Sequence, residues 1–267
     1  MSSTLGDLSH RDMRVLADAL DAERVIPPLS KFSLGQLGLN VQDERITEEL
    51  NRVSREGMKP PLLAFLLRAL ANEREEAQRL RDGIELVWTG PDVPGVHSRD
   101  THVVVRELFG SAETSVLISG YALYQGHTIF KSLSDRMEAR PCLEVRLFLN
   151  VGRPTGDPRG AEDLVREFAQ AFRTRHWPGK VAPSLFYDPR SLDGVEGQPA
   201  CLHAKCIVID DAIALITSAN LTQAAQERNI EAGVLVNDAR FARNLRVQFD
   251  TLLEQKALRP IPWSRQG

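Results

Sequence analysis

Five residues in the last third of the chain have the types and the spacing that phosphodiester chemistry needs. His203 and Lys205 stand two positions apart, and Ser218, Asn220 and Glu231 follow them. An imidazole can attack phosphorus when a hydrogen bond holds it in the tautomer that frees one ring nitrogen. Cationic and amide donors then balance the charge that grows on the phosphate oxygens. The set therefore predicts a site that attacks a phosphodiester.

Each of the five residues can be given a part in that reaction. His203 would be the nucleophile, and Glu231 would be the acceptor that orients its ring. Lys205 and Asn220 would hold the non-bridging oxygens, and Ser218 would add a hydroxyl donor. A protonated group on the side of the leaving oxygen is missing, although general acid help is worth about 10²- to 10⁴-fold in rate.

These residues must lie at the ends of neighbouring strands. The apolar run after Leu202 predicts a strand on which His203 and Lys205 point to the same face, because side chains alternate along a strand. Cys206 would then point to the opposite face, where we interpret it as buried packing.

A tight turn must follow that strand to bring the other residues back. Asp210-Asp211 predicts such a turn, because Asp tolerates the conformations that turns need. A second strand over residues 213–217 would return Ser218 and Asn220 to the first.

From residue 84 onward the chain alternates strand-like and helical segments, which predicts an α/β sandwich with a mixed sheet. Short apolar runs indicate strands, and apolar residues at helical spacing indicate helices. The strands are expected near residues 84–88, 115–121 and 143–149, and the helices near residues 101–110, 128–139 and 161–175.

The first part of the chain is predicted to be a helical region instead. Apolar residues recur at helical spacing near 13–20, 46–53 and 60–80, and proline pairs separate these segments. We therefore expect three parts, a helical region over 1–83, a catalytic-type domain over 84–258 and a tail over 259–267.

The site residues carry a resemblance to a known family. The pattern His203-x-Lys205-x4-Asp210, followed by Ser218-x-Asn220, resembles the HKD signature of the phospholipase D superfamily. Glu231 falls where that family has the glutamate that supports its histidine. The resemblance implies a phospholipase D-like αβα sandwich, a covalent phosphohistidine intermediate, and no metal or other cofactor. We interpret Asp210 as structural support at the turn.

Only one copy of the motif is present. The family brings two motifs together across a twofold axis, and the second histidine serves as the acid. No other histidine is followed by Lys two positions later. The other histidines are His10, His97, His102, His127 and His176. The resemblance therefore implies a homodimer in which the two copies of His203 meet.

One residue departs from the family pattern. The family usually has Gly immediately before the serine, whereas this chain has Thr217. A β-branched residue narrows the freedom of the backbone, so we expect reduced activity or an altered substrate range.

Weaker features resemble the phospholipase D-like component of bacterial DISARM anti-phage systems. They are the helical preamble, the stretch from Glu85 to Pro91, the strand end Ser119-Gly120-Tyr121 and the single motif. This resemblance implies a role against phage DNA beside other defence subunits.

Composition is that of an ordinary globular protein, with 42% hydrophobic and 26% charged residues and a net charge of -3. No basic arm indicates nucleic acid, although a few clustered cations would suffice to bind phosphates. The three cysteines match no metal or redox pair. No signal peptide and no apolar run of membrane-spanning length is evident. We therefore expect a cytoplasmic protein that does not bind a membrane.

Three functions stay open on sequence alone. The first is a dimeric, metal-independent nuclease acting on DNA. The second is a catalytically weak subunit that binds nucleic acid or acts as a scaffold. The third is a phospholipid hydrolase or phosphatidyltransferase, which the lack of a membrane-binding helix disfavours. Tyr121 and Tyr124 could stack on bases, but aromatic residues at a strand end favour a core position.

Overall fold

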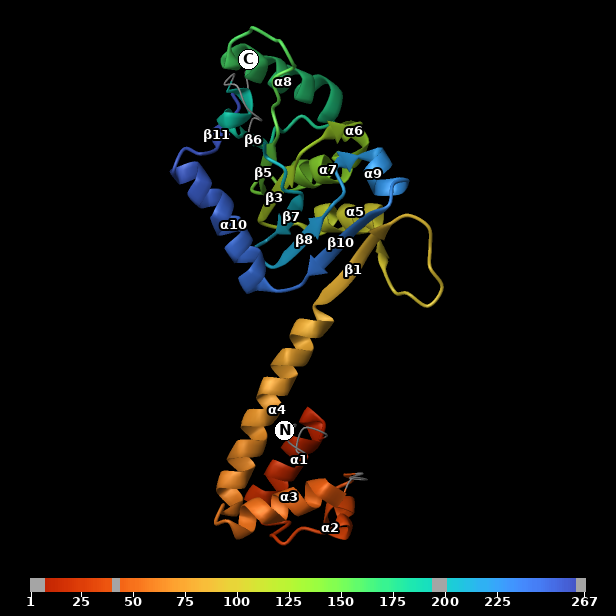
Figure 1. Cartoon of the computed structure of the whole chain (residues 1–267), viewed down its shortest axis with the longest axis vertical. Helices are drawn as coiled ribbons and strands as arrows, with labels where there is room; N and C mark the ends of the chain where they lie inside the picture. Colours follow the sequence, from red (N-terminus) through yellow and green to blue (C-terminus); the bar gives the residue numbers. More distant parts are fainter. Residues whose placement is uncertain (1–7, 40–43, 194–200, 263–267) are drawn as a thin grey trace. The chain divides into compact units, whose positions relative to one another are not determined.

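The computed structural model describes residues 8–39, 44–193 and 201–262 of the 267-residue chain. The chain forms two compact units, Met1–Asp82 and Gly83–Gly267 (Figure 1). Among the described residues, each unit has buried apolar clusters of its own.

The N-terminal unit is helical, as the apolar spacing predicted. The hydroxyl of Ser9 accepts a hydrogen bond from the backbone N–H of Asp12, and this N-cap satisfies one of the free donors at the start of the first helix. Leu16 of that helix and Leu67 of the last are fully buried in one core. The helices are α1 (His10–Asp21), α2 (Lys31–Gln36), α3 (Glu44–Arg55) and α4 (Pro60–Asp82).

The short helix α2 was not predicted from the sequence. It begins with a reciprocal pair of hydrogen bonds, in which the hydroxyls of Ser30 and Ser33 each accept from the other residue's backbone N–H. Such a box usually carries Glu or Gln at its fourth residue, so two serines are a weaker sequence signal.

In the C-terminal unit, the described residues form one mixed sheet of nine strands in the order β11-β6-β5-β3-β7-β8-β10-β1-β2. β3, β5 and β6 run parallel, and β7, β8 and β10 pair antiparallel between β3 and β1. A second sheet pairs β4 with β9. The strands are β1 (Ile84–Thr89), β2 (Arg99–Asp100), β3 (Ser115–Gly120), β4 (Leu123–Tyr124), β5 (Glu144–Leu149), β6 (Ser184–Tyr187), β7 (Cys206–Ile209), β8 (Ile213–Thr217), β9 (Leu221–Thr222), β10 (Glu231–Val236) and β11 (Arg259–Pro260).

Helices cover both faces of the large sheet, which confirms the predicted mixed α/β sandwich. One core cluster joins the sheet to α5, α7 and α8, and another joins the opposite face to α10 (Figure 1). The helices are α5 (Thr101–Ser111), α6 (Gly126–Ile129), α7 (Lys131–Ala139), α8 (Ala161–Ala171), α9 (Gln223–Glu227) and α10 (Ala239–Glu254). A π-helical turn, Phe172–His176, extends α8, and a 3₁₀ turn spans Pro189–Leu192.

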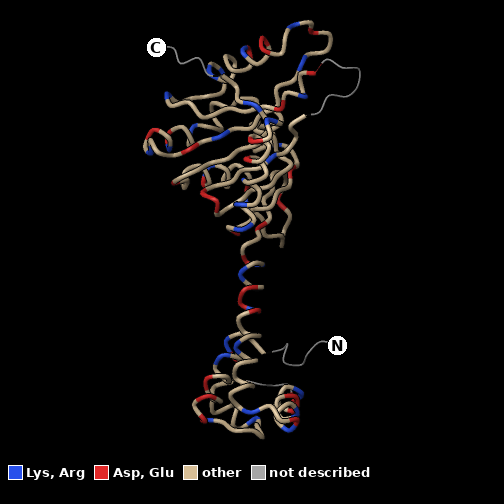
Figure 2. The backbone as a smooth tube through the Cα atoms, turned by 90° about the vertical axis from the view of Figure 1, so that its left-hand side faces the viewer, with Lys and Arg blue, Asp and Glu red and all other residues tan. Residues whose placement is uncertain are grey.

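Charged residues of both signs are spread along the backbone of both units (Figure 2). This distribution agrees with the small net charge of -3. Within the described ranges, no helix combines the length and the apolar character that crossing a membrane requires.

Some boundaries differ from the sequence pattern. The expected helix over 128–139 is divided at Phe130 into α6 and α7. The expected strand from residue 202 begins only at Cys206, because Ser119 is the partner of Cys206 and β3 ends one residue later. The segment after residue 258, expected to be a tail, begins with the edge strand β11, which pairs with β6.

The hairpin that joins β7 to β8 is fixed by Asp210. Asp210 and Asp211 both have left-handed conformations, with φ of 53° and 56°, which a short polar side chain tolerates. The Asp210 carboxylate accepts hydrogen bonds from the backbone N–H groups of Glu113, Thr114 and Ser115 at 2.7 to 2.9 Å. These bonds tie the turn to the loop before β3, in agreement with a structural part for this residue.

The same hydrogen bonds set the ionisation of Asp210. Burial alone would raise its pKa, but the backbone N–H groups of Ser115, Thr114 and Glu113 outweigh burial and hold the pKa below its ordinary value. A carboxyl with a lowered folded-state pKa stabilises the fold above its unfolded pKa of about 3.9, and that stabilisation is lost as pH falls through the lowered pKa.

We predict that Asp210→Asn lowers the free energy of unfolding by about 1.5 to 3 kcal/mol near pH 7, because an amide N–H₂ then faces backbone N–H donors. The difference from wild type should narrow as pH falls below about 3.9, because the unfolded chain then binds a proton that the native carboxylate still resists. Denaturant unfolding of both proteins at several pH values measures this difference in the free energy of unfolding. Asp92→Asn is the control, because Asp92 is exposed and has no hydrogen-bond partner among the described residues. A difference that stays constant with pH would contradict the assigned role.

Candidate active site

The five predicted site residues lie along one edge of the large sheet. This edge holds the C-terminal ends of β3 and β8 and the N-terminal ends of β7 and β10 (Figure 1). His203 and Lys205 immediately precede β7, Ser218 and Asn220 immediately follow β8, and Glu231 is the first residue of β10.

The side chains of His203 and Lys205 lie together. The Lys205 Nζ atom is 3.3 Å from His203 Nδ1 and 3.4 Å from Nε2, and it donates to the backbone oxygen of His203 at 3.1 Å. His203 is exposed, and Lys205 is partly exposed. A single anion could therefore contact the imidazole and the ammonium group together.

Tyr121 completes this cluster, although the sequence pattern favoured a core position for it over stacking on bases. The Tyr121 ring centroid is 4.7 Å from the His203 ring centroid. Lys205 Nζ lies 5.7 Å from the same Tyr121 centroid. The expectation that Tyr121 lies in the core is wrong, because the residue is 40% exposed. The available signal was its position directly after β3, at the edge where the other site residues were expected.

Glu231 is bonded to Ser218 and not to the histidine. Ser218 Oγ donates to Glu231 Oε2 at 2.5 Å, and Asn229 Nδ2 donates to Oε1 at 3.2 Å. Within the described residues, no hydrogen bond joins Glu231 to His203, so the expected orienting bond is not formed in this structure.

Asn220 is held by one end of its carboxamide. Its Oδ1 accepts from the backbone N–H of Ala122 at 3.2 Å, and the next residue, Leu221, donates its N–H to the oxygen of Ala122 at 3.1 Å. The Nδ2 group has no hydrogen-bond partner among the described residues. It keeps two donors available for a ligand.

Thr217, the residue that departs from the family pattern, packs against a glycine. Its cross-strand partner is Gly233, where an added Cβ would lie 3.1 Å from the Thr217 Cβ atom and 2.9 Å from the Ile216 oxygen. Thr217 Oγ1 also accepts from the N–H of Ala219 at 3.0 Å. The extra side-chain atoms therefore sit beside a residue that leaves room for them.

Cys206 is not a candidate nucleophile. It is 3% exposed, and burial raises the pKa of its thiol to about 12. A protonated, buried thiol is a weak nucleophile, so the interpretation as packing is confirmed. Among the described residues, no three His, Cys, Asp or Glu side chains are grouped to hold a metal ion.

Two curated proteins are similar to the chain in sequence. The DISARM protein DrmC of Bacillus paralicheniformis is 28% identical over 159 residues, which cover 60% of this chain and 59% of that protein. The probable cardiolipin synthase YwiE of Bacillus subtilis is 25% identical over 187 residues, which cover 68% of this chain and 32% of that protein. The chain therefore spans less than two thirds of the length of either relative.

A solved structure illustrates the shared fold. The phosphatidylserine synthase of Haemophilus influenzae aligns with a TM-score of 0.50 and 17% identity, over 73% of this chain and 44% of that one. The sequence model of a family described as "Cardiolipin synthase, PLD-like domain" matches residues 105–253, which are more than half of the chain and include all five predicted site residues. The protein belongs to this phospholipase D-like family.

Proposed function

We propose that the protein is a metal-independent phosphodiesterase that cleaves DNA through a phosphohistidine formed on His203, in bacterial defence against phage. The observation that carries the proposal is the contact between the His203 imidazole and the Lys205 ammonium group at 3.3 Å. The similarity to a DISARM protein supports the defensive role and suggests other subunits of such a system as partners. A DNA target of this kind fits a cytoplasmic location.

In the proposed reaction, a ring nitrogen of His203 attacks the phosphorus atom. A P–N bond forms, and the P–O bond to the leaving oxygen breaks. Lys205 and the Nδ2 group of Asn220 hold the non-bridging oxygens, where donors fixed in advance stabilise the growing charge. Water then attacks the phosphorus atom, breaks the P–N bond and releases a phosphate monoester.

The hydrogen bonds at Ser218 change the parts that we assign to it and to Glu231. Because the Ser218 hydroxyl donates its proton to Glu231, that proton is not free for a phosphate oxygen. The Ser218 oxygen in turn accepts from the N–H of Ala232 at 3.1 Å. We assign Ser218 and Glu231 as positioning residues that hold the strand ends together beside His203.

The leaving oxygen needs a proton, and one copy of the motif lacks its donor. We propose a homodimer in which His203 of the partner subunit donates this proton and later takes one from the attacking water. One composite site would then need both histidines.

The dimer can be tested by co-refolding wild-type protein with increasing amounts of His203→Ala protein. If each site needs two intact histidines, activity should follow the square of the wild-type fraction, because only wild-type pairs are active. Co-refolding with His97→Ala protein, altered at an exposed histidine with no partner among the described residues, should leave activity unchanged. A linear dependence on the wild-type fraction would contradict the shared site.

The reaction itself can be tested by cleavage of single- and double-stranded DNA in EDTA. His203→Ala should lose at least about 10³-fold in rate, because it removes the attacking group, whereas His97→Ala should keep the wild-type rate. Labelled DNA should stay attached to the wild-type chain through the P–N bond. The protein is denatured in alkali, because a P–N bond is labile in acid. EDTA-resistant cleavage that survives His203→Ala would refute the mechanism.

The same assay separates the other candidate functions. Hydrolysis of phospholipid vesicles without cleavage of DNA would favour a lipid phosphodiesterase, which the similarity to a probable cardiolipin synthase supports. DNA binding without cleavage of either substrate would favour a nucleic-acid-binding or scaffolding subunit. Either result would overturn the nuclease proposal.

Tyr121 should orient the two reacting side chains through its ring. We predict that Tyr121→Ala lowers kcat about tenfold, because ring contacts with an imidazole and a cation are worth about 0.5 to 1.5 kcal/mol. Tyr121→Phe should keep most of the activity, since it retains the ring. Tyr124→Ala is the control, because Tyr124 is 66% exposed. An effect on KM alone would instead indicate that Tyr121 binds substrate.

A further inference from the structure

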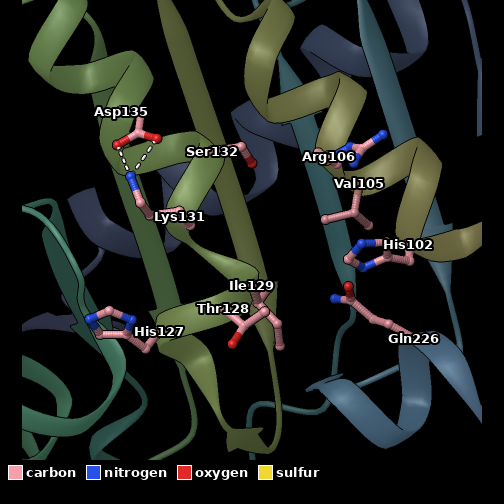
Figure 3. A pocket seen from close by; sticks show the side chains of 10 residues that line it. All are labelled: His102, Val105, Arg106, His127, Thr128, Ile129, Lys131, Ser132, Asp135 and Gln226. Atoms are coloured by element: carbon pink, nitrogen blue, oxygen red, sulfur yellow. Dashed lines mark hydrogen bonds and ion pairs between the residues drawn. The ribbon is translucent and has the colours of Figure 1, made fainter.

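A cavity of about 490 Å³ lies beside the candidate active site, between α5 on one side and α6 and α7 on the other, with α9 at one end (Figure 3). Val105 and Ile129 give it apolar surface. A smaller cavity shares Val105 and Gln226 with it and is also lined by Lys205 and Asn220. Val105 and Gln226 therefore form a wall between the large cavity and the smaller one, which two proposed catalytic residues line.

Gln226 is the residue that points to a ligand. It is only 3% exposed, and its side chain lines the cavity (Figure 3). Its backbone oxygen accepts from the Thr89 hydroxyl at 3.5 Å, but its carboxamide has no hydrogen-bond partner among the described residues. Among the described residues, the carboxamide atoms are not among the buried side-chain atoms that lack a partner. They are therefore open to the cavity and available to bond with whatever occupies it.

The charges around the cavity define what it can hold. Arg106 has no ion-pair partner within the described ranges, whereas Lys131 is neutralised by Asp135, with Nζ at 2.5 and 2.6 Å from the two carboxylate oxygens. The remaining polar lining comes from His102, His127, Thr128 and Ser132. One uncompensated guanidinium group matches the single charge of a phosphodiester better than the higher charge of a free phosphate ester.

We propose that this cavity binds one nucleotide unit of a nucleic acid strand. The base would lie against Val105 and Ile129, where the Gln226 carboxamide supplies both a donor and an acceptor for the base edge. The backbone phosphate would contact Arg106. A volume of about 490 Å³ lies within the range of pockets that enclose small molecules.

The inference rests on the proposed function only in taking a strand as the source of the nucleotide. A free nucleotide offers the same chemistry, so both sources must be compared. Binding is measured with full-length His203→Ala protein, which should not consume the probe. The probes are a short fluorescein-labelled DNA strand, followed by anisotropy, and the four deoxynucleoside monophosphates as competitors.

Two further substitutions in that protein test the cavity. Gln226→Met keeps an unbranched side chain of similar size but removes the amide. It should weaken strand binding about tenfold while leaving the melting temperature unchanged or higher, because it removes an unpartnered polar group. A residue with only a structural role would not separate binding from stability in this way.

Arg106→Gln should also weaken strand binding about tenfold. It should reduce the slope of log affinity against log salt by about 0.7, as expected for one lost phosphate contact on a single strand. The matched control is Arg240→Gln, because Arg240 is exposed on α10 and has no ion-pair partner among the described residues. Its affinity and slope should stay those of the parent protein.

Several results would overturn the inference. Strand binding within twofold of the parent for both Gln226→Met and Arg106→Gln would show that no nucleotide enters the cavity. Loss with Arg106→Gln alone would indicate a surface cation only. Displacement of the labelled strand by a monophosphate as readily as by the same concentration of unlabelled strand would exclude the strand as the source.

Failure of the proposed function would look different. Wild-type protein that does not cleave DNA in EDTA, but whose strand binding is weakened by Gln226→Met, would refute the nuclease and support the nucleotide site. Cleavage that depends on His203, with strand binding unaffected by either cavity variant, would support the nuclease and refute the nucleotide site.

Discussion

The register between β7 and β8 is the constraint on which the candidate site depends. Cys206 pairs with Ile216, so the residues just before β7 lie beside those just after β8. Because side chains alternate along a strand, a slip of one residue would turn the set containing His203 and Lys205 away from Asn220. The carboxylate bonds at the turn connect this hairpin to the loop before β3. Those bonds therefore fix the position of the chemistry, although they lie at the opposite end of the strands.

Much of this arrangement follows from local sequence, and the rest depends on neighbours that are distant in sequence. Alternation and the paired aspartates were sufficient to predict the hairpin and the edge where the site residues meet. They did not predict the start of β7, because that strand begins only where Ser119 of β3 can pair with Cys206. The edge strand β11 exists for a similar reason, since Arg259 finds a partner in Tyr187 of β6. Strand ends are decided by pairing, which local patterns do not contain.

Side-chain partners were harder to predict than backbone positions. Glu231 was expected to bond to His203, yet it accepts from Ser218, its neighbour across the sheet edge, and from Asn229. A carboxylate bonds to whichever donor the fold brings within reach, so its partner depends on tertiary geometry. The same limit applies to Tyr121, where aromatic character alone does not distinguish a core ring from a ring at a site. In both cases the sequence indicated the strand end at which the residue lies but did not determine what its side chain contacts.

One polar side chain beside the site faces a cavity without a protein partner among the described residues. The Gln226 carboxamide has no hydrogen-bond partner among the described residues, and the side chain lines both the large cavity and the smaller one that reaches Lys205 and Asn220. A chain with a net charge of -3 has no general attraction for a polyanion. The proposed recognition of a nucleic acid would then come from a few local contacts, and an unpaired guanidinium group beside an unpartnered amide provides contacts of that kind.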